Sequence, residues 1–216
     1  MTNTAKIELA KEQPVMGTHG QGVKFKITNA TVMYVKNVGY GALKFGEKEV
    51  EDKPWVNHQY EMDILISPEI KKVLREAHKP TSIKEFTAEE FKKTFKIDPP
   101  FESDEYIVTK FYKEAYWKSG SSKGDVAPRI DFKKMGTGED LKEVGIGNGS
   151  VASFLVEVKP YKNDFGTGTS ARLGSVYVTD LVPYAVGGSN DDAEFGMTAP
   201  PEEKSSGGDD DEWDDA

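Results

Sequence analysis

Residues 60–70, YEMDILISPEI, contain the change from strand to helix on which the fold depends. In the first part apolar and polar side chains alternate, so that Met62, Ile64 and Ile66 point to one side, which is typical of a strand with one buried face. Ser67 then supplies a helix N-cap, and the proline after it suits the first helical position. Apolar residues continue at helical spacing as far as residue 77. The stretch therefore predicts a strand that leads directly into a helix.

A second helix is predicted a few residues later. Thr87 and Glu90 form a capping box, and Phe91 and Phe95 follow four residues apart on one face. Two prolines after Asp98 end the helical part. Strand-like segments lie on both sides of the helices: residues 24–28, 30–35, 42–45 and 60–67 before them, and residues 106–117, 127–132, 150–161 and 171–184 after them.

The order of these elements favours one fold class. Short, glycine-bounded strands on both sides of a helical insertion are typical of a small antiparallel barrel and not of a doubly wound sheet. A barrel that closes on itself also removes the exposed strand edges. We therefore expect a mainly β protein, a barrel with one or two inserted helices.

The charges divide the chain into two parts. The 216 residues carry 37 acidic and 28 basic side chains, a net charge of −9, and no cysteine, which excludes disulfides, thiolate catalysis and cysteine-bound zinc. Residues 188–216 hold 11 of the acids and one lysine, a net charge of −10, so residues 1–187 are close to neutral at +1. We expect residues 1–187 to fold as one domain and residues 188–216 to be a disordered acidic tail.

The tail has two interpretations. It is a solubilising extension, or it binds a partner through an aromatic anchor among its charges. Phe195, Met197 and Trp213 lie among the carboxylates, and a basic rim around an apolar pocket would match that arrangement. The candidate partner-binding residues are Trp213 and its neighbours Asp209, Asp210, Asp211, Glu212, Asp214 and Asp215.

Motifs for catalysis, cofactors or membranes are not found. The three histidines lie in unrelated contexts, and no serine has the Gly-x-Ser-x-Gly frame. The glycines of residues 145–149 and 166–174 lack the offsets of nucleotide-binding loops, so we expect them in hairpin turns. No apolar run approaches the length of a membrane span, and no targeting segment is recognised. We expect no enzyme activity, no cofactor and no metal site.

Cations and aromatic rings are interleaved on the predicted strands. Alternation places Lys110, Tyr112 and Tyr116 on one face, and residues 159–162, KPYK, repeat the pattern at a strand end. Bases stack on exposed rings and lysines neutralise phosphates, which is how single strands are bound without reading sequence. For any single residue the alternative is a core ring or a solvated lysine. The candidate DNA-binding residues are Lys110, Tyr112, Tyr116, Tyr161, Lys162, Arg172 and Trp55.

Residues 156–181, with the Pro160-Tyr161-Lys162 sequence before a Gly-Ser segment, a hydrophobic last strand and an acidic tail, resemble the C-terminal part of the T7-type phage single-stranded DNA-binding proteins. Residues 60–68 and 106–117 resemble strands of the same family. The resemblance implies an OB-fold, a five-stranded type of barrel, and sequence-independent binding of single-stranded DNA in replication, recombination and repair. It also implies that the protein acts in the cytoplasm of the infected bacterial host. Its tail would contact replication proteins such as the polymerase or the helicase/primase, and the protein could form a homodimer.

The resemblance carries over to particular residues. Tyr161 matches a stacking ring and Lys162 a phosphate partner, and Lys110 and Tyr112 match less closely. The helix around Phe91 is extra, and the family's tail ends in an aromatic residue, whereas this tail ends after Trp213 in Asp-Asp-Ala.

Two hypotheses follow from the sequence. In the first, the chain is a non-enzymatic single-stranded DNA-binding protein whose acidic tail covers the groove when DNA is absent. In the second, it is an interaction or scaffold protein whose acidic arm mimics nucleic acid toward a basic partner.

Overall fold

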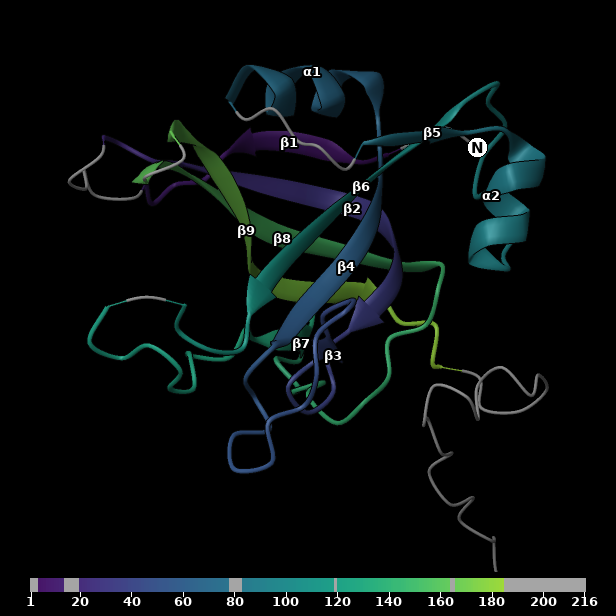
Figure 1. Ribbon diagram of the computed structural model, residues 1–216. Helices are drawn as coiled ribbons and strands as arrows, with labels where there is room; N and C mark the ends of the chain where they lie inside the picture. The colour runs from purple at the N-terminus through teal and green to yellow at the C-terminus, as the bar shows by residue number, and fades with distance from the viewer. Residues whose placement is uncertain (1–3, 14–19, 78–82, 119, 164–165, 185–216) are drawn as a thin grey trace, which may run out of the picture. The chain divides into compact units, whose positions relative to one another are not determined.

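The computed structural model describes residues 4–13, 20–77, 83–118, 120–163 and 166–184. Within these residues the chain forms one nine-stranded sheet and two helices (Figure 1). The elements in chain order are β1 (Lys6–Leu9), β2 (Val23–Lys36), β3 (Ala42–Leu43), β4 (His58–Ile66), α1 (Pro68–Ala77), β5 (Lys84–Phe86), α2 (Ala88–Phe95), β6 (Tyr106–Glu114), β7 (Phe132–Lys134), β8 (Ser150–Asn163) and β9 (Gly166–Asp180).

The five long strands β2, β4, β6, β8 and β9 form the body of the fold. The sheet runs in the order β5-β6-β4-β2-β8-β9-β7, with β1 added to β2 and β3 to β4. All pairs are antiparallel except β7 with β9. Strands β6 and β9 contact each other, but no ladder joins them among the described residues, so the sheet curls without closing. The prediction of a mainly β fold, a five-stranded type of barrel with inserted helices, is confirmed. Full closure of the barrel is not seen among the described residues.

The inward faces of the long strands form the core. Met62, Ile64 and Ile66 are buried there, as their alternation predicts, against Phe111 of β6 and Phe154 of β8. Because each strand buries every second residue, the residues between them form an outward face. The fold therefore fixes which side chains are available for binding.

Both helices begin at the predicted caps. The backbone N–H of Ile70 donates to the Ser67 hydroxyl at 3.3 Å, and α1 buries Ile70 and Leu74 against the core. Helix α2 has the complete capping box of Thr87 and Glu90. In Figure 1, α1 lies near β1 and α2 lies beside β5.

Helix α2 covers one end of the outward face. Its Phe91 and Phe95 are fully buried in a second apolar cluster, together with Met33, Leu65, Tyr106 and Val108 from β2, β4 and β6. The rest of the outward face of these three strands is not covered by this cluster. The position of α2 therefore sets where an exposed surface begins.

Some expectations about secondary structure were wrong. The segments 24–28 and 30–35 form one strand, β2, because Asn29 and Tyr34 take positive φ and shift its register without ending it. Strand β7 begins only at Phe132, so most of residues 127–132 is not strand. The glycines of residues 166–174 lie within β9 and not in a turn. The short strands β1 and β5 were not predicted.

The acidic tail, residues 188–216, lies outside the described residues, and so do the expectations that concern it. Neither of the two described helices is long and apolar enough to cross a membrane.

Candidate nucleic-acid interface

Strand β6 separates core residues from surface residues by simple alternation. Phe111 is buried in the core, whereas Tyr112 is 41% exposed. Lys110 lies on the same outward face as Tyr112, because residues two apart in a strand share a face. Further along this face Tyr106 and Val108 are covered by the α2 cluster. The predicted pair therefore stands directly beside the covered end of the outward face.

Lys110 is held by two carboxylates. Its Nζ lies 3.2 Å from Glu61 Oε1 and 3.8 Å from Asp63 Oδ1, both on β4 and both largely buried. Burial raises the pKa of the Asp63 carboxyl, the charge of Lys110 opposes that rise, and the charge of Glu61 adds to it. A phosphate at Lys110 must therefore compete with two carboxylates, which reduces what this lysine adds to binding.

The register places these residues in two rows across the sheet. Met33, Asp63 and Lys110 are cross-strand neighbours on β2, β4 and β6, and Lys36, Glu61 and Tyr112 form the next row. We call Lys36, Glu61, Asp63, Lys110 and Tyr112 the central face. It combines one exposed ring with a compact group of opposite charges.

Trp55 and Tyr116 are held at the loop end of the sheet. The half-buried Trp55 packs against the main core, and its Nε1 donates to the Gly124 carbonyl at 3.1 Å. Lys44 donates to the Tyr116 hydroxyl at 3.0 Å and lies 5.2 Å from the centre of that ring. These contacts join the segment between β3 and β4 to the segment between β6 and β7. Neither ring is freely available in this arrangement, in contrast to Tyr112.

Tyr161 lies on the β8–β9 hairpin and is 43% exposed. It pairs with Gly168 on β9, and a Cβ atom at Gly168 would lie 2.8 Å from the Tyr161 hydroxyl oxygen. The ring therefore lies over the backbone of its partner, where only glycine leaves enough space. The ring of Tyr161 is therefore partly exposed and lies close to the backbone of β9.

Lys162 and Arg172 are also exposed on this hairpin. Arg172 pairs with Glu157, and Tyr161 pairs with Gly168. Because Arg172 lies four residues after Gly168 on β9, an even number, Arg172 shares the face of Tyr161. Lys162 is adjacent in sequence and therefore points to the opposite face. Lys159 shares the face of Tyr161, and its Nζ lies 3.0 Å from Glu157 Oε2. Tyr161 and Lys162 therefore lie on opposite faces of the β8–β9 hairpin.

Lys113 connects β6 with the hairpin strands electrostatically. Its Nζ donates to the Pro128 carbonyl at 2.6 Å. Burial lowers the pKa of Lys113, the charge of Arg172 lowers it further, and Asp131 and Glu157 oppose this. Lys113 and Arg172 therefore bring positive charge together where β6 contacts β9. Sequence reasoning missed Lys113, because alternation assigns it to the same face as the core residue Phe111.

Tyr34 is an exposed ring that sequence reasoning missed. It lies on β2 and is 38% exposed, and its hydroxyl donates to the Thr94 carbonyl in α2. The sequence assigned residues 30–35 to a regular strand, where Tyr34 had no special position. The signal that identifies it is the positive φ of 47°, which only the structure shows.

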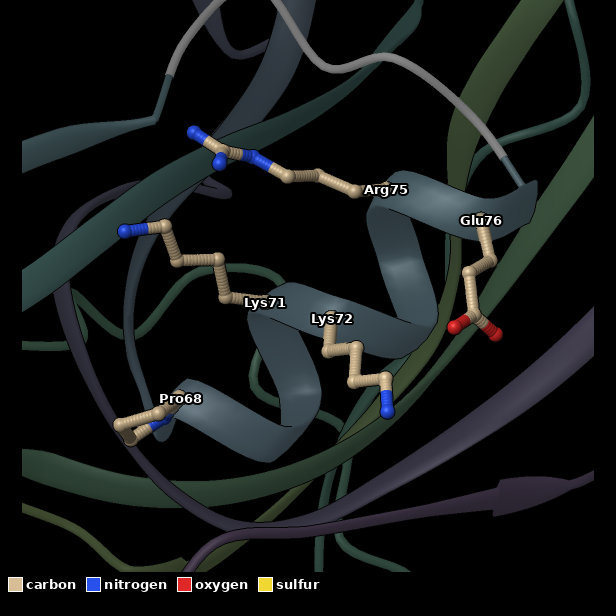
Figure 2. Close-up of a pocket in the computed structure, with 5 residues that line it drawn as sticks. All are labelled: Pro68, Lys71, Lys72, Arg75 and Glu76. Atoms are coloured by element: carbon tan, nitrogen blue, oxygen red, sulfur yellow. The ribbon is translucent and has the colours of Figure 1, made fainter.

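A hollow on α1 is lined by side chains of opposite charge. Figure 2 shows Lys71 and Arg75 extending to one side of the helix and Lys72 and Glu76 to the other, with Pro68 at the helix start. Lys71 forms an ion pair with Glu85 of β5. No predicted site residue lies in this hollow, and the ion pair already neutralises part of its positive charge.

Within the described part of the chain, no group of three or more histidine or acidic side chains is placed to hold a metal ion. The candidate partner-binding residues Trp213, Asp209, Asp210, Asp211, Glu212, Asp214 and Asp215 lie outside that part.

No protein-family model and no curated protein matches this chain. Among solved structures, it is similar to the single-stranded DNA-binding protein from bacteriophage Enc34 in complex with ssDNA, with 18% identity, 82% of this chain and 100% of that chain covered, and a TM-score of 0.45. It is also similar to gp2.5, a single-stranded DNA-binding protein encoded by bacteriophage T7, with 19% identity, 74% of this chain and 92% of that chain covered, and a TM-score of 0.43. Both of these solved structures are of phage single-stranded DNA-binding proteins.

Proposed function

We propose that the chain binds single-stranded DNA without sequence preference and without enzymatic activity. The binding surface consists of the central face and the exposed residues of the β8–β9 hairpin, Tyr161, Lys162 and Arg172. The protein acts in phage DNA replication and recombination inside the infected bacterial host. The acidic tail competes with DNA for the same surface and recruits replication proteins.

One observation carries the proposal: Tyr112 and Tyr161 are exposed on regular strands, and cations lie near each ring. Tyr112 is in the row of Lys36 and beside Lys110, and Tyr161 shares its face with Arg172. Backbone pairing holds both rings in place, so little conformational entropy is lost when a base stacks on them. Every base has an aromatic face, and stacking is therefore tolerant of sequence.

The charges of the central face support binding through rings more than through phosphates. Glu61 and Asp63 lie next to Lys110, and their negative charges repel a phosphate that approaches this lysine. Exposed cations such as Lys162 and Arg172 have more freedom to contact the DNA backbone. We therefore expect bases to lie over Tyr112 and phosphates to lie toward the hairpin.

The tail's role rests on the charge division of the sequence. A segment of net charge −10 that is joined to a DNA-binding domain has a high effective concentration at any basic surface of that domain. It therefore competes as a polyanion when DNA is absent. DNA displaces it, and the released carboxylates and Trp213 are then available to replication proteins.

A fluorescence titration of the full chain with oligo-dT at low salt tests the binding itself. Trp117 is 43% exposed near the loop end, so its emission should change when DNA binds, whereas the hydrogen-bonded Trp55 should respond less. A Trp117→Phe variant assigns the signal. Added salt should reverse the binding with a log–log slope of about −0.7 for each phosphate contact.

The tail is tested separately by removing residues 188–216. Competition predicts that the shortened chain binds oligo-dT more tightly than the full chain at the same salt concentration. Unchanged affinity would contradict competition and leave DNA binding itself intact. If neither form responds to oligo-dT, the alternative applies, in which the folded domain is a carrier and the acidic arm engages a basic partner protein.

A further inference from the structure

Tyr34 is fixed at an irregular point of β2. Its φ of 47° is in the left-handed region, which bulky residues rarely occupy, and the register of β2 against β4 shifts between Met33 and Lys36. The backbone N–H of Tyr34 donates to Asn148 Oδ1 at 2.8 Å. The hydroxyl at the far end of the side chain donates to the Thr94 carbonyl. Both ends of the residue are therefore anchored.

The ring of Tyr34 packs on a buried ring of α2. Its centre lies 5.3 Å from the ring centre of Phe95, which is fully buried in the α2 cluster. The side chain is still 38% exposed. Asn148 also donates to the Phe95 carbonyl at 2.7 Å, so one side chain fixes both the bulge of β2 and the end of α2. The result is a rigid aromatic surface that is partly open to solvent.

Tyr34 belongs to the same outward face as Tyr112. It packs on the cluster that covers this face, and its pKa is raised by burial and by the nearby charge of Asp63. Asp63 is itself a member of the central face and is paired with Lys110. Tyr34 and Tyr112 therefore lie at two positions around one charged group, Glu61, Asp63 and Lys110.

We propose that Tyr34 is a third base-stacking residue, in addition to Tyr112 and Tyr161, so that single-stranded DNA extends from Tyr112 across β4 and β2 to the edge of α2. This inference rests on the proposed function and extends its surface. Helix α2 then has a role in binding, because Phe95 supports the ring on which a base stacks. The carboxylates between the two rings keep phosphates away from the centre, and the bases face the sheet there.

The test compares three variants of the full chain by their affinity for a fluorescently labelled oligo-dT. Tyr34→Asn removes the ring but suits the positive φ, since asparagine is common in that region. We expect its affinity to fall about 5- to 150-fold, the range for loss of one stacked base. Tyr34→Phe keeps the ring and loses only the bond to Thr94, so its affinity should stay within about twofold of the wild type. Tyr177→Asn, which removes a ring of similar exposure (37%) on β9, is the matched control.

The double variant Tyr34→Asn/Tyr112→Ala separates stacking from a positioning role. Two independent stacking rings predict that the fold-losses multiply. If Tyr34 only positions Tyr112, the double variant binds like Tyr112→Ala alone, and the inference is wrong. It is also wrong if Tyr34→Asn, shown to be folded by circular dichroism, binds like the wild type. Failure of the wild type to bind oligo-dT would instead refute the proposed function.

Discussion

Removal of the Tyr161 ring tests whether the β8–β9 hairpin stacks on bases. The ring is 43% exposed and lies over Gly168, so Tyr161→Ala removes a surface that is partly open to solvent and leaves the core unchanged. Stacking contributes about 1–3 kcal/mol per base, so we expect oligo-dT affinity to fall roughly 5- to 150-fold. Because every base has an aromatic face, the loss should be equal for oligo-dT, oligo-dC and mixed sequences. Fluorescence anisotropy of labelled oligonucleotides measures all three.

A second change moves the same ring without removing it. In Gly168→Ala the new Cβ would lie 2.8 Å from the Tyr161 hydroxyl oxygen and 2.9 Å from Cζ, so the ring must shift. We expect weaker binding than in wild type and stability changed by less than about 1 kcal/mol, because the flexible side chain can move away. Tyr161→Phe, which keeps the ring, is the control and should bind like the wild type. A loss in Tyr161→Ala that depends on base identity, or no loss at all, would refute the stacking role.

Three further predictions concern stability and are checked by urea unfolding. Asp63→Asn should raise the free energy of unfolding near neutral pH, because burial is the main reason that the pKa of Asp63 is raised. The pKa of Asp63 is higher in the folded than in the unfolded state, so the wild type loses stability as pH rises through the folded pKa. The difference in free energy of unfolding between Asp63→Asn and the wild type should therefore grow from acid to neutral pH. A difference that does not change with pH would contradict this. Phe95→Ala should cost about 3–5 kcal/mol, because the ring is fully buried in the α2 cluster; a loss below about 1 kcal/mol would contradict that packing. Thr87→Ala should cost about 1 kcal/mol through loss of the capping box, and an unchanged midpoint would show that the box does not stabilise α2.

Local signals in the sequence were sufficient for the helices and for most long strands. The Ser67 cap and the Thr87–Glu90 capping box depend on residues three apart, so the sequence displays them directly. The face of β6 follows from alternation alone, which places Lys110 with Tyr112 and buries Phe111. These features need no knowledge of tertiary contacts.

Contacts between distant segments could not be predicted in the same way. Trp55 is bonded to Gly124, and Lys110 is held by Glu61 and Asp63 only because β4 and β6 pair in one particular register. Tyr34 becomes special through a bulge whose position depends on Asn148, more than a hundred residues away. The sequence therefore predicts which types of residue form a binding surface. The register of strand pairing decides which of these side chains are exposed and which are held by other residues.

The separation of Tyr161 and Lys162 illustrates a limit of motif reasoning. The sequence treats the two as neighbours, and the strand places their side chains on opposite faces of the hairpin. Single-stranded DNA that stacks on Tyr161 therefore lies on the same face as Arg172. It can contact Lys162 only by passing around the edge of the hairpin. We expect Arg172→Gln to weaken binding more than Lys162→Gln, in affinity measurements at one salt concentration.

The central claim is that the outward faces of β6 and the β8–β9 hairpin bind single-stranded DNA through exposed rings. The most direct measurement is the affinity of the full chain and of Tyr112→Ala/Tyr161→Ala for oligo-dT over a series of salt concentrations. We predict salt-sensitive binding by the wild type and a large loss in the double variant with little change in the salt slope, because the rings neutralise no phosphates. Equal affinities of the two proteins, or no binding by the wild type at low salt, would contradict the claim.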